Sequence, residues 1–217
     1  MSLEEEFVLK KYRFYFKRDI ESAFISHLDM MRLMERVLRR LDVKIKWTQG
    51  FNPHPKINFI LPMSTGLIGK NEIFEVEITD DVDKSIIENM NALLPYGICI
   101  LNMEEATDKI FVSEMKYSIE FKPFSEACDI INKFHNFMSG EVIITKKDGR
   151  KRDAKDYICS YTIIFNNPIY RVTFNIKPLE GRYVKPEEII NKFLKETEIN
   201  AKIVRVAREE IIFKRGI

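Results

Sequence analysis

Hydrophobic and polar residues alternate with a period of two in two segments that lie about 100 residues apart. The segments are Lys11–Lys17 and Lys116–Lys122, and they are identical at four of seven positions. Each presents three large apolar side chains on one face, which is typical of a strand with one side in the core. Because an internal repeat determines architecture, we interpret the two segments as the first strands of two similar halves.

The other predicted elements recur in the same order in both halves. In the first half we predict helices at Ser26–Leu41 and Lys84–Leu94 and strands at Ile57–Leu61, Phe74–Asp80 and Ile98–Met103. In the second half we predict helices at Ser125–Met138 and Pro186–Lys195 and strands at Tyr157–Phe165, Tyr170–Lys177 and Ala201–Val206. The order β-α-β-β-α-β is that of a ferredoxin-like unit. We therefore predict an α+β fold of tandem duplicated ferredoxin-like (βαββαβ) domains with antiparallel sheets, residues 1–110 and 111–217; one mixed sheet with irregular helices is the alternative.

The predicted helix Ser26–Leu41 has two distinct faces. Leucines and methionines form the apolar face, which we expect in the core: Leu28, Met31, Met34, Leu38 and Leu41. Four arginines share the opposite side with Asp29: Arg32, Arg36, Arg39 and Arg40. A guanidinium donates a planar fork to an anion, so this stripe predicts contacts with phosphates. The alternative is a solvated face with ion pairs to Asp29 and Glu35.

A stiffened loop follows a short predicted strand, Lys44–Trp47. Gly50 permits a positive φ, and Pro53 and Pro55 each fix one φ angle, which lowers the cost of ordering the loop around a ligand. We predict a ligand-reading loop made of Gln49, Gly50, Phe51, Asn52 and His54, with Lys56 as a further phosphate contact. Trp47 and Phe51 have the chemistry to stack on bases, but for Trp47 a place in the core is the favoured interpretation.

The candidate catalytic residues are His27 and His54, because a histidine is the commonest general base. A capping or structural role is the alternative for both. We predict no metal site, since two histidines without HxH or HxxxH spacing are too few ligands. Three cysteines about thirty residues apart, Cys99, Cys128 and Cys159, predict reduced thiols and no iron–sulfur cluster in this chain. We therefore expect no cofactor.

The charge of the chain is strongly segregated, although the formal net charge of its 217 residues is only +2. Residues 10–56 contain 12 basic and 5 acidic side chains, residues 57–115 contain 3 and 11, and residues 116–217 contain 20 and 14. The last of these segments includes a basic hairpin tip at Lys146–Lys155. Basic flanks permit RNA as a partner, and equally permit a role in solubility alone.

No apolar run approaches the roughly 18 to 20 residues of a membrane helix. The start of the chain, Met1–Phe7, has glutamates where a signal peptide has positive charge. We therefore expect a cytoplasmic protein with no membrane partner.

Two motifs resemble those of a known family: Phe24–Arg40, FISHLDMMRLMERVLRR, and Gln49–Phe59, QGFNPHPKINF. They are similar to the radical-SAM-linked protein family, a domain of unknown function that is fused to radical SAM enzymes or encoded beside them. The resemblance covers roughly Lys11–Glu105 and places the family motifs in the first predicted domain. It implies a separately encoded radical SAM enzyme as partner and a link to RNA, and it supplies no catalytic residue. Without a cysteine cluster motif, this chain resembles the free-standing form.

The function predicted from these patterns is a non-catalytic RNA-binding or substrate-presenting accessory protein of a radical SAM enzyme. One alternative is a metal-independent endoribonuclease, because the predicted duplication is also similar to that of CRISPR repeat-associated RNA-binding proteins. The other alternative is a pure protein-interaction module. Whether the chain is an enzyme is left open by the sequence, and a role without catalysis of its own is favoured.

Overall fold

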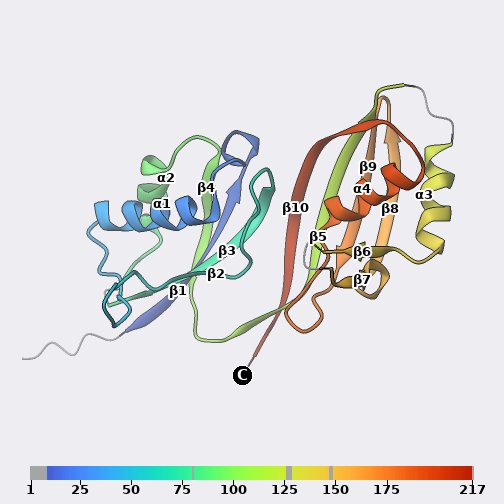
Figure 1. Ribbon diagram of the computed structural model, residues 1–217. Helices are drawn as coiled ribbons and strands as arrows, with labels where there is room; N and C mark the ends of the chain where they lie inside the picture. Colours follow the sequence, from blue (N-terminus) through green and yellow to red (C-terminus); the bar gives the residue numbers. More distant parts are fainter. Residues whose placement is uncertain (1–8, 80, 126–128, 147–148, 217) are drawn as a thin grey trace, which may run out of the picture. The chain divides into compact units, whose positions relative to one another are not determined.

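The computed structural model describes residues 9–79, 81–125, 129–146 and 149–216 (Figure 1). The chain divides into two compact units, one made of Met1–Lys109 with Arg215–Ile217 and the other of Ile110–Lys214. Both units contain helices and antiparallel strands. The α+β class predicted from the sequence is confirmed.

The first unit is a four-stranded antiparallel sheet with two α-helices. Its strands are β1 (Lys10–Arg18), β2 (Ile57–Phe59), β3 (Ile68–Ile78) and β4 (Ile98–Glu105). Its helices are the short 3-10 turn η1 (Ile20–Ser22), α1 (His27–Arg40) and α2 (Ser85–Leu93). The strands lie in the order β4-β1-β3, and β2 pairs with β3.

The core of the first unit is formed by apolar side chains on one face of β1, β2 and β3. Phe14 of β1 is opposite Phe74 of β3, and their rings stack with centroids 5.0 Å apart. Phe59 of β2 packs on Phe74 at 5.4 Å. All three are buried together with Met34 of α1, so the period of two in β1 places its apolar side chains as predicted.

The buried face of α1 differs from the predicted one. The helix buries Met30, Met34, Val37 and Leu38, whereas Leu28 is 63% exposed. Leu28 precedes Met30 by two positions, and two positions in an α-helix turn the side chain by about 200°. The apolar face is therefore centred on Met34, and Leu28 belongs to the surface.

The segment between α1 and β2 is less regular than predicted. The expected strand Lys44–Trp47 is present only as isolated bridges, Ile45 with Ile78 and Trp47 with Pro55. Between these bridges the Lys46 amide donates to the Glu77 carbonyl at 2.8 Å. In Figure 1 this segment leaves the end of α1 and returns to β2, which pairs with β3.

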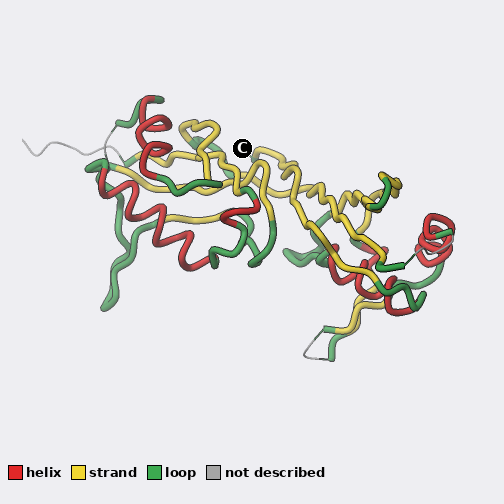
Figure 2. Tube along the Cα trace, turned by 90° about the horizontal axis from the view of Figure 1, so that it is seen from above, coloured by secondary structure: helices red, strands yellow, loops and turns green. Residues whose placement is uncertain are grey.

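The second unit has the strand order β10-β5-β9-β8. Its strands are β5 (Ile110–Pro123), β8 (Ile158–Asn166), β9 (Ile169–Ile176) and β10 (Ala201–Arg215), with a separate pair β6 (Ile143–Thr145) and β7 (Lys151–Asp153). Its helices are α3 (Ile130–Ser139), the 3-10 turn η2 (Ala154–Asp156) and α4 (Pro186–Glu196). Phe134 and Phe193 join α3 to α4 in the core, with ring centroids 4.9 Å apart. Figure 2 shows the helices beside the strands in both units.

Some predictions fall on residues that lie outside the described ranges. These are the start of the chain at Met1–Phe7, the end of the predicted strand at Asp80, part of the start of the helix predicted from Ser125, Cys128, and the hairpin tip at Lys147 and Asp148. In the described part, α3 begins at Ile130 rather than at Ser125. Cys99 is half-buried and Cys159 is exposed, and both are free thiols.

Candidate nucleic-acid interface

The arginine face of α1, made of Arg32, Arg36, Arg39 and Arg40, is exposed at all four positions. The helix begins at its cap Ser26, whose hydroxyl accepts a bond from the Asp29 amide. Arg32 pairs with Asp29 at 3.3 Å and Arg39 with Glu35 at 3.4 Å. Among the described residues, neither Arg36 nor Arg40 has an ion-pair partner. The face therefore keeps a net positive charge.

Asp29 stays ionised beside these arginines. The bond from the Ser26 hydroxyl, followed by the bond and charge of Arg32 and the charge of Arg36, lowers the pKa of Asp29. The carboxylate is fully charged at neutral pH and compensates only part of the neighbouring positive charge. Ion pairs between exposed side chains contribute little to stability, so they yield readily to a phosphate.

Arg39 connects the arginine face to the segment that follows α1. Its guanidinium carbon lies 5.8 Å from the centroid of the Trp47 ring. Trp47 is 39% exposed, so the favoured interpretation of this residue as part of the core is wrong. Trp47 is exposed because the chain turns at Asp42, directly after α1. Asp42 has a left-handed φ of 56°, and the turn brings Trp47 next to Arg39 rather than into the core.

A hollow of about 490 Å³ lies at this place. We call it the tryptophan hollow. Its lining residues come from the end of α1 and the segment after it: Arg39, Asp42, Val43, Lys44, Ile45 and Trp47. Of these residues, only Arg39 and Trp47 are candidate ligand contacts on sequence grounds. Asp42 could have indicated a turn after the helix, because aspartate is one of the few residues other than glycine that adopt a left-handed conformation readily.

The predicted reading loop is closed at its base and exposed at its tip. Trp47 bridges Pro55, the Thr48 amide donates to the His54 carbonyl at 2.8 Å, and the His54 amide donates to the Thr48 hydroxyl at 3.0 Å. The tip residues Gln49, Gly50, Phe51 and Asn52 are exposed, and Phe51 is fully so. Gly50 has a φ of 137°, a conformation that only glycine adopts without strain.

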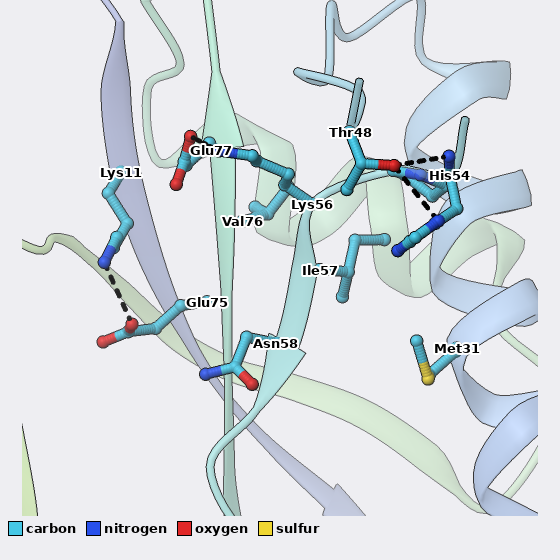
Figure 3. Close-up of a pocket in the computed structure, with 11 residues that line it drawn as sticks. Lys11, Met31, Thr48, His54, Lys56, Ile57, Asn58, Glu75, Val76 and Glu77 are labelled. Carbon is cyan, nitrogen blue, oxygen red and sulfur yellow. Dashed lines mark hydrogen bonds and ion pairs between the residues drawn. The ribbon is translucent and has the colours of Figure 1, made fainter. Parts of the chain in front are cut away.

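A second pocket, of about 360 Å³, lies beside His54 (Figure 3). The Nδ1 atom of His54 is 3.1 Å from the Thr48 hydroxyl, and Met31 reaches the pocket from α1. Its lysines face carboxylates: Lys11 lies 3.6 Å from Glu75, and Lys56 lies 3.1 Å from Glu77. The predicted phosphate contact Lys56 is therefore already compensated, unlike the arginine face.

Glu77 remains charged in this pocket. Burial acts to raise its pKa, but hydrogen bonds from Lys56 and Lys46 outweigh burial and lower the pKa. Lys46 is 3.4 Å from the same oxygen. Two ammonium groups and one carboxylate thus form a compact cluster near the end of β3.

The two candidate histidines have separate surroundings. His27 is the first residue of α1, and its ring packs edge-on against Phe59 with centroids 5.3 Å apart. His54 contacts Thr48 and the Asn52 carbonyl instead. His54 lines the second pocket and His27 does not. Within the described ranges, no group of three or more His, Cys, Asp or Glu side chains is arranged to hold a metal ion.

These features define the class of the molecule: a two-unit α+β protein with a basic surface on one helix of its first unit. The chain belongs to the family described as "Uncharacterized protein conserved in bacteria (DUF2344)", whose model matches residues 11–186. No curated protein matches the sequence. None of the helices in the described ranges has the length and apolarity to cross a membrane.

Several solved structures resemble the fold at low sequence identity. The archaeal box H/ACA sRNP Nop10-Cbf5 complex is 10% identical, with a TM-score of 0.48 over 91% of this chain and 47% of that chain. A Cbf5-Nop10-Gar1 complex is 10% identical, with a TM-score of 0.49 over 91% and 49%. The CRISPR endoribonuclease Cse3 bound to 19 nt RNA is 9% identical, with a TM-score of 0.22 over 90% and 99%. This chain spans about half the length of the first two, and scores of this size support no argument about function.

Proposed function

We propose that this protein binds RNA through the arginine face of α1 and the reading loop, without catalysis of its own. The observation that supports this most directly is the Arg39 guanidinium above the Trp47 ring, since it brings the arginine face and the base of the loop together. A cationic stripe beside exposed aromatic side chains is the combination that single-stranded nucleic acid requires.

The spacing of the arginines suits a phosphate backbone. Arg32 and Arg40 are eight residues apart on one helix, which corresponds to about 12 Å along its axis. Arg36 lies between them without an ion-pair partner among the described residues, and it can donate to a phosphate without breaking an existing pair. Lys56, in contrast, would have to break its ion pair with Glu77 to reach a phosphate, so its contribution to RNA affinity should be smaller.

We also propose that each unit is a ferredoxin-like domain, with the boundary between residues 110 and 111. The spatial strand order is β4-β1-β3-β2 in the first unit and β10-β5-β9-β8 in the second, which is the same scheme. Along the chain, an α-helix follows β1 and β3 in the first unit and β5 and β9 in the second. This similarity supports an internal duplication.

A radical SAM enzyme as partner is a proposal that rests on the sequence resemblance of Phe24–Arg40 and Gln49–Phe59. Affinity purification of the tagged protein from its own cells, followed by mass spectrometry, tests this part independently of RNA binding. Recovery of a radical SAM enzyme in stoichiometric amount is the expected result, and its repeated absence would remove this part of the proposal.

We do not extend the proposal to ribonuclease activity. His27 packs on Phe59, whereas His54 contacts Thr48, and of the two only His54 lines the second pocket. Incubation of labelled RNA with wild type and with His54→Ala checks this point: the RNA should stay intact with both proteins.

RNA binding is tested by filter binding over a salt series with wild type and Arg36→Ala. If Arg36 contacts a phosphate, its loss should weaken binding and reduce the slope of log affinity against log salt by about 0.7, the value for one single-strand phosphate contact. The matched control is Arg182→Ala, which removes one exposed arginine from the second unit. Equal slopes for all three proteins, or equally weak binding at moderate salt, would overturn the proposal and favour a protein-docking role.

A further inference from the structure

The tryptophan hollow offers a more specific conclusion, which rests on the proposed RNA binding. We infer that this hollow holds one unpaired nucleobase, so that the RNA bound by this protein is single-stranded where it passes Trp47. The inference concerns the class of RNA, which the arginine face alone does not determine, because phosphates are present in single strands and duplexes alike.

The hollow has the size and the surface for a base. Its volume of about 490 Å³ lies within the range of about 300 to 1,000 Å³ that is usual for small-ligand sites. Trp47 contributes a partly exposed indole, and the half-buried Val43 and the buried Ile45 complete the apolar part of the lining. An indole gives a stacked base a large π-face, and every base can use it.

The backbone around Trp47 is held in place before any ligand arrives. Its backbone bridges Pro55, and the Lys46 amide just before it donates to the Glu77 carbonyl of β3. The Lys56 amide donates to the Lys46 carbonyl at 2.9 Å. A stacking platform held in this way loses little conformational freedom when a base binds.

The charges around the hollow favour a base inside it and phosphates at its rim. Arg39, which also pairs with Glu35, and Lys44 carry positive charge at the lining, and Arg40 continues the arginine face next to Arg39. Asp42 is the one carboxylate among the described lining residues. It repels a phosphate but can accept a hydrogen bond from an exocyclic amino group or from a ribose hydroxyl.

A duplex cannot use this arrangement. In A-form RNA the base faces are stacked on one another, and the major groove is too deep and narrow for side chains to read. Only an unpaired nucleotide can turn its base onto the indole. The arginine face would still hold a duplex weakly through phosphates, which makes single strand against duplex the informative comparison.

The chain contains one tryptophan, so its fluorescence reports on Trp47 alone. Titration of the full-length protein with a short single-stranded RNA should quench this fluorescence with saturation, whereas a blunt duplex of the same sequence should not. Filter binding in parallel gives the affinities. Trp47→Ala should weaken single-strand binding roughly 5- to 150-fold, the range for loss of one stacked base, and should bring it close to the affinity for duplex.

Two variants keep this test interpretable. Trp47→Phe retains an aromatic face and should restore most of the single-strand affinity, which separates loss of stacking from loss of folding. Tyr96→Ala removes an exposed aromatic side chain that does not line the hollow, and it should bind like wild type. Circular dichroism checks that each variant is folded.

The outcomes distinguish this inference from the proposed function. If the protein binds RNA with an Arg36-dependent salt slope but without quenching and with equal affinity for single strand and duplex, the inference is overturned and RNA binding stands. If no RNA binds above background, both are overturned. If Trp47→Phe is folded and as weak as Trp47→Ala, a stacking role for Trp47 is excluded.

Discussion

The buried guanidinium of Arg13 shows how a single residue organises charge in the first unit. Arg13 is 0% exposed and contacts three carboxylates, Glu75 at 2.8 Å, Glu104 at 3.0 Å and Asp108 at 3.1 Å. Burial alone would lower its pKa, but the hydrogen bonds that Arg13 donates to these carboxylates outweigh burial and raise the pKa above its ordinary value. Arg13 therefore stays charged, and its partners account for part of the acidity of residues 57–115.

Glu104 makes this network sensitive to acid. Burial acts to raise its pKa, yet hydrogen bonds from Tyr15, Arg215 and Arg13 outweigh burial and lower the pKa. A lowered folded-state pKa gives stability that is present above the ordinary glutamate value of about 4.3 and is lost as the pH falls through the folded-state value. In wild type, the free energy of unfolding should therefore fall as the pH is lowered from about 6 to about 3. In Glu104→Gln this fall should be smaller by on the order of 1 kcal/mol.

Urea unfolding at a series of pH values measures this effect. Glu88→Gln is the matched control, since Glu88 is exposed on α2 and its removal should leave the pH dependence as in wild type. A Glu104→Gln protein with the wild-type pH profile would show that the network does not hold Glu104 in its charged form.

Among the helices, α1 begins at a local N-terminal cap, Ser26. The Ser26 hydroxyl accepts from the Asp29 amide and donates to the Asp29 carboxylate at 2.7 Å. This cap satisfies one of the free amides in the first turn and fixes where the helix begins. It also determines the angular position of each arginine on the exposed side.

Removal of this cap should cost stability without changing the core. We expect Ser26→Ala to lower the free energy of unfolding by about 0.5 to 2 kcal/mol, the usual cost of a lost serine cap. Chemical denaturation measures the loss, and Ser125→Ala, an exposed serine outside the helices, should change it by less than about 0.5 kcal/mol. Equal stability of the two variants would mean that tertiary packing alone holds the start of α1.

At the scale of the whole molecule, each unit has its own aromatic core. Phe74 is buried in the first unit with Phe14, and Phe134 is buried in the second with Phe193. Two compact units with separate cores are expected to open as separate cooperative blocks. Hydrogen exchange measured by mass spectrometry in moderate urea can follow both blocks in one sample.

Core truncations should therefore act on one unit at a time. Phe74→Ala should destabilise the first unit by about 3 to 5 kcal/mol and leave protection in the second nearly unchanged, and Phe134→Ala should do the reverse. Each variant serves as the control of the other. Equal loss of protection in both units from either variant would show that the chain unfolds as one block.

The sequence by itself determined the principal helices and strands of both units, but not the pair β6–β7, and the strand expected at Lys44–Trp47 is present only as isolated bridges. The period of two in β1 and β5, the Ser26 cap and Pro186 at the start of α4 are local signals, and local signals act over a few residues wherever the chain is placed. The exposure of the four arginines likewise follows from the helical period, once Met34 is on the buried side.

Only the tertiary structure decided which cationic side chains pair with a carboxylate and which remain available to bind a phosphate. Arg13 meets partners 62, 91 and 95 residues away, and Lys56 meets Glu77 of β3, 21 residues away. No local pattern therefore distinguishes these cations from those of the arginine face. Trp47 follows the same principle: its exposure depends on the turn at Asp42 and on the bridge to Pro55. Trp47, which the sequence places in the core, therefore lies at the surface and lines the tryptophan hollow, because burial is decided by what the rest of the fold brings against a side chain.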